Sequence, residues 1–279
     1  MKELQERAER GEELSIVESD ELAQLKKQYH DFLADGMGRL QAGGGLDDKG
    51  QQPHTDDFVA AIDNVRQSVA VVGKAAYFWG SLFATVVPGY FGRKLGVTTG
   101  FLHWSFITDR LILGALPVVT QVGSSGNHLA QLREQLKSRN QQLGLVIACL
   151  EDIEIQGFGV EIVRFADEPC WHHHMGSTVA YISLPIVDTT AEISFEDVAN
   201  TVKEMDLCIS QRQCAVYVHC KAGKGRSWML VMCYLTTYGK MTFGQAETLI
   251  RDMRPQINPS PSQQAFASQF ASRFHMAQE

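Results

Sequence analysis

The feature that most constrains this chain is a segment in which a buried strand, a glycine-containing loop and an apolar helix follow one another directly. Residues 215–218 have the β-branched and aromatic composition of a buried strand, and an apolar helix is expected from Arg226 onward. The nine residues at the junction are His219, Cys220, Lys221, Ala222, Gly223, Lys224, Gly225, Arg226 and Ser227. This order points backbone N–H groups and a helix N-terminus into one concavity, which predicts an anion-binding site.

The residue types in this loop indicate chemistry on a phosphate ester. A field that binds phosphate also stabilises a thiolate, so Cys220 is predicted to be a nucleophile with a pKa below that of a free thiol. Arg226 supplies a planar guanidinium that can bind two phosphate oxygens at once. Ser227 is expected to donate to the departing sulfur. The residues expected to bind substrate or order the loop are Lys221, Ala222, Gly223, Lys224, Gly225 and His219.

A leaving alkoxide needs a proton, so a carboxylic acid is expected opposite the loop. Asp188 follows a strand-like run over residues 181–187 and precedes a capped helix start at Ser194. This order places Asp188 at the carboxyl edge of the predicted sheet, where the active sites of α/β proteins form. Asp188 is therefore the candidate general acid, and the alternatives are Asp167, Glu192 and Asp197.

Apolar runs that alternate with helical patterns predict an α/β fold with a central mixed, mostly parallel sheet flanked by helices. The expected strands cover residues 111–116, 145–150, 160–165, 179–187 and 215–219, and helices are expected after Ser194, Thr242 and Ser260. The three consecutive histidines over residues 172–174 are expected to lie in a solvated loop. Because consecutive side chains diverge, they are not expected to bind one metal ion together.

The N-terminal part of the chain differs in composition from the rest. Of 32 acidic and 25 basic residues, 14 and 7 lie within the first 60 positions, so the excess negative charge belongs there. We expect an acidic, partly disordered extension over residues 1–57, a membrane-associating segment over 58–100 and the catalytic domain over 101–279. Nucleic acid is not an expected partner, because no basic block is present. The spacing of the 6 cysteines indicates reduced thiols.

Residues 75–92 contain no charged side chain and are rich in aromatic residues. A stretch of this length is at the lower limit for crossing a bilayer, and Pro88 with several glycines weakens a spanning helix. The aromatic residues suit the interface between headgroups and acyl chains. We therefore expect an in-plane or re-entrant membrane anchor, with a helical hairpin buried against the catalytic domain as the alternative.

These motifs resemble the protein-tyrosine-phosphatase superfamily and its dual-specificity-like branch. The runs over residues 77–94, 104–117, 217–223, 254–255 and 261–263 are similar to the mitochondrial tyrosine-phosphatase-like phosphatidylglycerophosphate phosphatases. The resemblance implies a cysteine-dependent enzyme that needs no metal and no cofactor, with Cys220 as nucleophile, Arg226 as phosphate clamp and Asp188 as acid.

The resemblance also implies phosphatidylglycerophosphate as a phospholipid substrate, contact with a membrane surface and a location at the mitochondrial inner membrane. No transit peptide is recognisable, and the cytoplasm is the alternative location. Lys224 and Gly225 make the loop resemble that of 3-phosphoinositide phosphatases, and Trp228 stands where a small residue is usual. A phosphoinositide or protein dual-specificity phosphatase and a binding protein without turnover therefore stay open as alternatives. Cys149 is similar in position to the backdoor cysteine of phosphoinositide phosphatases, which implies a disulfide with Cys220 under oxidation.

Overall fold

The computed structural model describes residues 71–82, 103–119, 127–159 and 164–276 of the 279-residue chain. The chain divides into two compact units. One comprises Met1–Tyr77 with Val160–Ile162, of which only 71–77 are described, and the other comprises Phe78–Gly159 with Val163–Glu279. The predicted extension over residues 1–57 and most of the segment over 58–100 lie outside the described residues, so these boundaries stay predictions.

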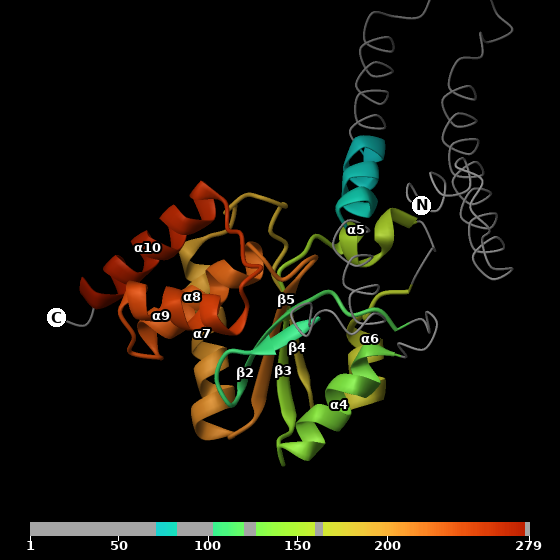
Figure 1. The fold of residues 1–279 in the computed structure, drawn as a ribbon, viewed down its shortest axis with the longest axis horizontal. Helices are drawn as coiled ribbons and strands as arrows, with labels where there is room; N and C mark the ends of the chain where they lie inside the picture. The colour runs from blue at the N-terminus through green and yellow to red at the C-terminus, as the bar shows by residue number, and fades with distance from the viewer. Residues whose placement is uncertain (1–70, 83–102, 120–126, 160–163, 277–279) are drawn as a thin grey trace, which may run out of the picture. The chain divides into compact units, whose positions relative to one another are not determined.

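The second unit is built, within its described residues, on one five-stranded sheet with the order β1-β2-β5-β3-β4 (Figure 1). The strands are β1 (Trp104–Phe106), β2 (Leu111–Ala115), β3 (Leu143–Ala148), β4 (Ala180–Ser183) and β5 (Ala215–Cys220). β1 is antiparallel to β2, whereas the other three pairings are parallel. The predicted mixed, mostly parallel sheet is therefore confirmed, and β5 lies at its centre.

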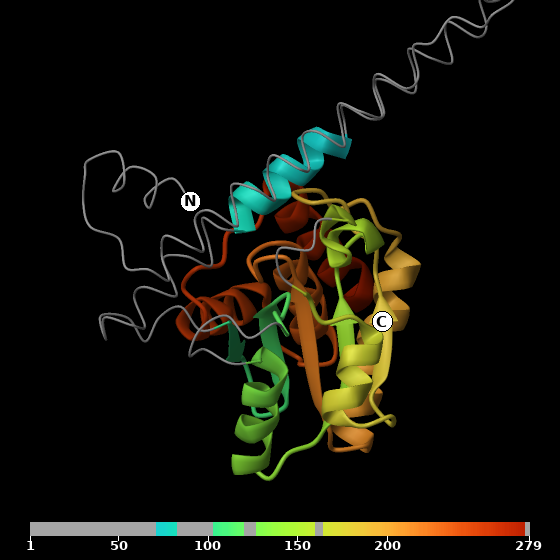
Figure 2. The ribbon, with the colours of Figure 1, turned by 90° about the vertical axis from the view of Figure 1, so that its right-hand side faces the viewer.

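Helices cover both faces of this sheet (Figure 2). They are α4 (His128–Ser138), α5 (Asp152–Ile155), α6 (Glu168–Met175), α7 (Phe195–Asp206), α8 (Arg226–Thr237), α9 (Phe243–Met253) and α10 (Pro261–Met276). Successive side chains of β5 alternate between two apolar clusters, since Val216 and Val218 pack with α7 to α10 whereas Tyr217 packs with α4 and α6. Burial on both faces explains why the central strand has a continuous apolar sequence.

The helix starts agree with the capping residues in the sequence. The Ser194 side chain accepts from the backbone N–H of Asp197 at 3.0 Å, and Thr242 forms a reciprocal capping box with Gln245. All residues of α8 are buried, including the bulky Trp228. The core directly behind the loop therefore accommodates the indole of Trp228, although a small residue is usual at this position.

Four expectations about local structure were wrong or incomplete. The strand expected over residues 179–187 ends at Ser183, because Pro185 has no N–H to continue the ladder. In the strand expected over 160–165, the first four residues lie outside the described part, and Phe165 makes only an isolated bridge with Val118. The three-residue β1 was missed because its pattern is too short to recognise.

The three histidines lie in the last turn of α6, not in a loop. The Asp167 side chain caps this helix by accepting from the backbone N–H of Cys170 at 2.9 Å, and Pro169 lies in the first helical turn. An aspartate followed two residues later by proline is a helix-start signal that outweighs the polar character of the histidines.

Candidate active site

The predicted strand, loop and helix adjoin one another at the carboxyl edge of the sheet. β5 ends at Cys220, residues 221–225 form the loop, and α8 begins at Arg226. The N-cap residue of α8 is Gly225, so no capping side chain binds the first amides of this helix. The segment therefore has the arrangement that favours anion binding at a helix N-terminus.

Cys220 lies at the start of this loop with 4% of its surface exposed, and its Sγ is 3.2 Å from the Oγ of Ser227. Burial alone would raise the pKa of the Cys220 thiol. The positive charge of Arg226 lowers it, as do hydrogen bonds from Ser227 and from the backbone N–H of Lys224, and the resulting pKa lies below the ordinary value. Because the thiolate is the nucleophilic form, these contacts prepare Cys220 for the predicted role.

The guanidinium of Arg226 is held by a carboxylate that the sequence did not reveal. Its Nη1 and Nη2 donate to the two carboxylate oxygens of Glu154 in α5, at 2.5 and 3.0 Å, and Nη1 also donates to the backbone oxygen of Ile186 at 2.9 Å. Both charged side chains are buried, with 1% and 4% of their surface exposed. Burial opposes the charge on Arg226, but the hydrogen bonds and charge of Glu154 outweigh it and raise the pKa of the guanidinium. This bidentate pair fixes the plane of the guanidinium.

Asp188 lies between two cations of the site. Its Oδ2 accepts from the Nζ of Lys221 at 2.6 Å, and its Oδ1 is 3.1 Å from the Nη2 of Arg226. Burial would raise the pKa of this carboxyl, but the charge of Arg226 and the hydrogen bond from Lys221 hold it below its ordinary value. The next residue, Thr189, has a φ of 65°. A β-branched residue rarely adopts this conformation, and such strain is concentrated at functional sites.

The three alternative acids have other contacts or lie in exposed positions. Asp167 caps α6, Asp197 bonds to the side chain of Ser194 at 2.7 Å, and Glu192 is exposed. Of these four candidates, Asp188 is the one with a contact to the loop of Cys220.

Arg254, which follows α9, holds the outer part of the loop in shape. This buried side chain donates from Nε to the backbone oxygen of Gly223 at 2.7 Å and from Nη2 to that of Ala222 at 3.2 Å. Burial, the larger effect, lowers the pKa of Arg254 to about 10. Gly223 has a φ of +66°, and a Cβ there would lie 2.5 Å from the backbone oxygen of Gly114. Glycine is therefore required at this position of the loop.

Gln263, at the start of α10, links the loop to the segment that carries Asp188. Its Nε2 donates to the backbone oxygen of Thr190 at 3.0 Å, and its Oε1 would lie 2.5 Å from a Cβ added to Gly225. Gly225 therefore allows the close approach that joins the loop, α10 and the Asp188 segment.

The other loop residues occupy distinct places. His219 is fully buried beside Trp171 and Tyr217, and burial lowers its pKa to about 3, so its imidazole is neutral. Neither ring nitrogen of His219 has a hydrogen-bond partner among the described residues, so the ordering role expected for His219 stays a prediction. Burial and then the positive charge of Arg254 lower the pKa of Lys224. The two loop lysines thus differ in their surroundings. Lys221 contacts Asp188, whereas Lys224 is close enough to Arg254 for the positive charge of Arg254 to lower its pKa.

Cys149 follows β3 directly, and its backbone N–H donates to the oxygen of His219 at 2.7 Å. Cys149 and Cys220 belong to the same apolar cluster. Burial, and after it the negative charge of Cys220, raise the pKa of the Cys149 thiol. Cys149 thus lies just beyond the end of β3, beside the end of β5 that carries Cys220, and a disulfide between them stays a prediction.

Of the predicted membrane-associating segment, only residues 71–82 are described, and they are helical. Phe78 and Trp79 belong to the same compact unit as the sheet and are buried, with 1% and 7% exposed. For these two residues the structure favours the alternative of packing against the catalytic domain. Among the described ranges, no helix combines the length and apolar character needed to cross a bilayer. In the same ranges, no group of His, Cys, Asp and Glu side chains could hold a metal ion.

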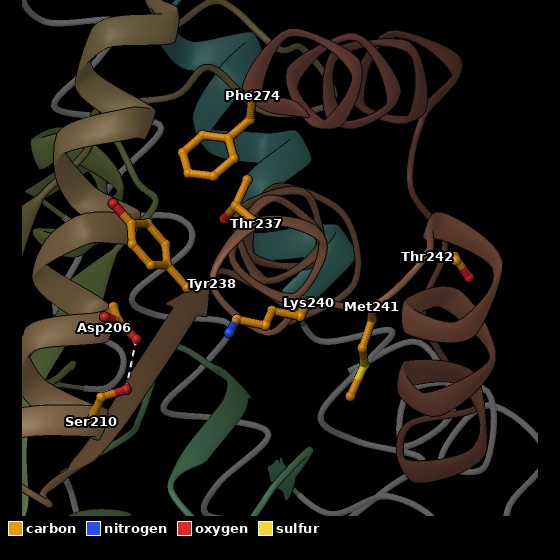
Figure 3. A pocket seen from close by; sticks show the side chains of 8 residues that line it. All are labelled: Asp206, Ser210, Thr237, Tyr238, Lys240, Met241, Thr242 and Phe274. Carbon is orange, nitrogen blue, oxygen red and sulfur yellow. Dashed lines mark hydrogen bonds between the residues drawn. The ribbon is translucent and has the colours of Figure 1, made fainter. Parts of the chain in front are cut away.

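A separate open cavity of about 630 Å³ lies at the opposite end of α8 (Figure 3). Its lining includes Asp206, Ser210, Tyr238, Lys240 and Phe274. The hydroxyl of Ser210 donates to the carboxylate of Asp206 at 2.7 Å, and the rings of Tyr238 and Phe274 are 5.6 Å apart. No residue of the 220–227 loop lines this cavity, so it is distinct from the site around Cys220.

Comparison with known families and curated proteins agrees with this geometry. Residues 139–272 match the family described as the catalytic domain of dual specificity phosphatases. Phosphatidylglycerophosphate phosphatase PTPMT2 of Arabidopsis thaliana is 44% identical over 55 residues, which cover 20% of this chain and 24% of that protein. Phosphatidylglycerophosphate phosphatase PTPMT1 of the same organism is 28% identical over 194 residues, which cover 69% of this chain and 48% of that protein. The chain thus spans less than half the length of these curated relatives.

Among solved structures, the fold is similar to that of PTPMT1 in complex with PI(5)P. The TM-score is 0.50 and the identity 22%, over 64% of this chain and 100% of that chain. At this identity the likeness concerns the fold, and it agrees with the predicted sheet flanked by helices.

Proposed function

Because this chain belongs to the dual-specificity branch of the protein-tyrosine-phosphatase superfamily, we propose that it hydrolyses a phosphate monoester through a covalent cysteinyl-phosphate. The observation that carries the proposal is the convergence of four groups at one loop. The thiol of Cys220 is 3.2 Å from the Ser227 hydroxyl, and the carboxylate of Asp188 is 3.1 Å from the Arg226 guanidinium. These groups supply a nucleophile, a hydrogen-bond donor to the sulfur, an acid and a clamp for phosphate.

In the first step, the Cys220 thiolate attacks phosphorus in line with the leaving oxygen. The S–P bond forms as the P–O bond breaks, and Arg226 binds the equatorial oxygens. Asp188 gives its proton to the leaving alkoxide. A bound phosphate dianion compensates the charges of Arg226 and Lys221, which otherwise lower the pKa of Asp188. Substrate binding therefore raises the pKa of Asp188 and lets it carry the proton that the leaving group needs.

In the second step, a water molecule attacks the phosphorus of the intermediate. The Asp188 carboxylate takes a proton from this water, the S–P bond breaks, and inorganic phosphate is released. Ser227 donates to the sulfur as it departs and so favours the thiolate. Each turnover returns Cys220 and Asp188 to their starting protonation states.

We propose phosphatidylglycerophosphate as the substrate, at a membrane surface and, as the sequence resemblance implies, at the mitochondrial inner membrane. Two curated relatives carry this activity in their names. The loop provides two lysines, Lys221 and Lys224, besides Arg226. Phosphatidylglycerophosphate carries a phosphodiester near its terminal phosphate, so it offers these additional cations a second anionic group.

A phosphoinositide is the second candidate substrate. It is favoured by Lys224, which gives the loop the sequence Cys-Lys-Ala-Gly-Lys-Gly-Arg. The PTPMT1 structure of similar fold is a complex with PI(5)P. A phosphoinositide also carries a diester next to its monoesters, so electrostatics alone does not separate the two lipids.

Phosphate release tests the proposal. The substrates are vesicles that contain phosphatidylglycerophosphate or phosphoinositides, and phosphotyrosine peptides in solution. We expect turnover of phosphatidylglycerophosphate to exceed that of the peptides, to disappear in Cys220→Ser and to persist in Cys214→Ser, a half-buried cysteine outside the loop. Faster turnover of peptides would overturn the lipid proposal. Unchanged phosphate release by both Cys220→Ser and Asp188→Ala would overturn the mechanism.

Contact with a membrane is tested by flotation of the full chain with anionic vesicles. Deleting residues 58–100 would also remove Phe78 and Trp79, which pack on the catalytic domain, so point substitutions are the better choice. Tyr90→Ser with Phe91→Ser changes two aromatic residues that lie outside the described ranges. We expect this variant to float less than the wild type, and equal flotation would contradict the predicted anchor.

A further inference from the structure

The segment that precedes the catalytic domain contributes two buried aromatic residues near the loop. The indole N–H of Trp79 donates to the backbone oxygen of Gly157 at 3.0 Å in a buried position. Gly157 has a φ of +60°, and a Cβ there would lie 3.0 Å from the Trp79 ring. This close approach fixes Trp79 against the residues that follow α5.

Phe78 is buried in an aromatic cluster with Trp79, Phe158 and Phe165. Its ring centroid lies 5.6, 5.4 and 5.9 Å from those of the three partners. Phe158 has a φ of 58°, an uncommon conformation for a residue other than glycine. Aromatic rings packed at these distances have well-defined orientations, so the position of the Phe78 ring is fixed by its neighbours.

The Phe78 ring reaches the loop of Cys220 through Lys221. The Nζ of Lys221 lies over this ring at 5.5 Å from the centroid, and the same Nζ is 2.6 Å from the Oδ2 of Asp188. An ammonium group within about 6 Å of a ring centroid is attracted to the ring face. Only 5% of Lys221 is exposed, so water competes weakly for this contact. Lysine has a long flexible stem, and a fixed ring reduces the number of places its ammonium can occupy.

We propose that Phe78 is a positioning residue of the active site, whose ring holds the Lys221 ammonium where it in turn holds the general acid Asp188. The inference rests on the proposed phosphatase function. Glu154 orients Arg226 on one side of Asp188, and Phe78 orients Lys221 on the other. The segment before the catalytic domain thereby becomes part of the catalytic machinery, which its aromatic composition alone did not indicate.

The test is the dependence of kcat/KM on the leaving group in the full chain, since kcat/KM reports the step in which the phenol departs. Aryl phosphates whose phenols range from strongly to weakly acidic report the general acid, because only a weakly acidic phenol needs a proton as it departs. For Phe78→Leu we expect kcat/KM to be unchanged with the most acidic phenol and to fall about fivefold with the least acidic one, the size of a partly desolvated cation–π contact. The plot of rate against phenol pKa should therefore become steeper.

The matched control is Phe106→Leu, which also removes a ring from beneath a cation, Arg139 at 4.0 Å, but lies outside the cluster around Phe78. We expect this variant to keep the leaving-group dependence of the wild type. In a Lys221→Met background, Phe78→Leu should add no further steepening, since the lysine through which it acts is gone.

An equal fall of kcat/KM across the series, steepening by Phe106→Leu, or full additivity of Phe78→Leu with Lys221→Met would each overturn the proposal. The aryl phosphate series contains no lipid, so it tests the Phe78 proposal separately from the lipid substrate. A wild type that hydrolyses aryl phosphates but not phosphatidylglycerophosphate would refute the lipid substrate, while the Phe78 proposal would still be decided by the slopes.

Discussion

The ion pair between Arg226 and Glu154 is the contact that most directly fixes the guanidinium proposed to clamp phosphate, and Glu154→Gln removes the charge of Glu154 while keeping its shape. In the native pair, two guanidinium nitrogens donate to two carboxylate oxygens at 2.5 and 3.0 Å. Glutamine offers one acceptor oxygen, and its NH₂ group faces a guanidinium donor. One hydrogen bond is thus lost and a repulsive donor pair takes its place.

The magnitude follows from burial. Leaving a buried charge without its partner costs about 3–5 kcal/mol, and losing one hydrogen bond to a charged group costs about 1.5–3 kcal/mol. Arg226 keeps its bond to the backbone oxygen of Ile186 and its contact with Asp188. We therefore expect a loss of about 3 kcal/mol in the free energy of unfolding and a fall in Tm of roughly 6–12 °C.

Thermal unfolding followed by circular dichroism measures the stability, and phosphate release from an aryl phosphate measures the clamp. We expect kcat/KM to fall at least tenfold, because the guanidinium plane is no longer fixed. Asp152→Asn is the control, since it makes the same chemical change at an exposed position of α5. If Glu154→Gln had the Tm and the kcat/KM of Asp152→Asn, the buried pair would not hold the clamp.

Three further predictions concern the loop. Ser227→Ala removes a hydrogen bond that lowers the pKa of Cys220, so the midpoint of Cys220 alkylation by iodoacetamide should move to higher pH, and an unchanged midpoint would contradict this. Gly223→Ala places a Cβ 2.5 Å from the Gly114 backbone oxygen at a φ of +66°, so urea titration should show a loss of about 1–3 kcal/mol, and a neutral result would refute the strain. Hydrogen peroxide should oxidise Cys220 to a sulfenic acid, which the Cys149 thiol converts to a disulfide with loss of water. Burial raises the pKa of Cys149, so this second step should be the slower one; peptide mass spectrometry should detect the disulfide in the wild type and not in Cys149→Ser.

The central strand, the loop and α8 could be predicted from sequence because each depends on local patterns. A continuous apolar strand and a glycine-containing loop have signatures within about 20 residues, and Ser194 and Thr242 mark helix starts by their own hydrogen bonds. Asp188 could be placed as well, since the end of a parallel strand defines the edge of the sheet where it must lie.

Glu154 could not be predicted, because its role arises from a contact 72 residues away in sequence. It belongs to a four-residue helix that also contains Asp152, and an acidic segment of this kind is typical of a solvated surface. The signal that distinguishes Glu154 is its burial, which depends on how α5 lies against the loop.

The aromatic segment shows a different limit of sequence reasoning. Tryptophan and phenylalanine near charged residues suit a membrane interface and a domain interior equally well, since both bury apolar rings and offer polar groups at the edge. Phe78 and Trp79 are buried against the residues that follow α5, and composition alone could not separate the two environments. The backbone of Gly157, whose φ is positive, is the partner in the folded chain that places the Trp79 ring in the interior of the domain.

The two carboxylates beside the loop, Glu154 and Asp188, differ in their contacts and in their burial. Glu154 accepts two hydrogen bonds from Arg226 and is nearly inaccessible to water, so its position is fixed. The side chain of Asp188 is 29% exposed and contacts Arg226 and Lys221, the same cations to which a phosphate dianion would bind. A dianion that binds these cations removes the interactions that keep Asp188 ionised. In the proposed mechanism, protonation of Asp188 is thereby coupled to the arrival of the substrate that requires the proton.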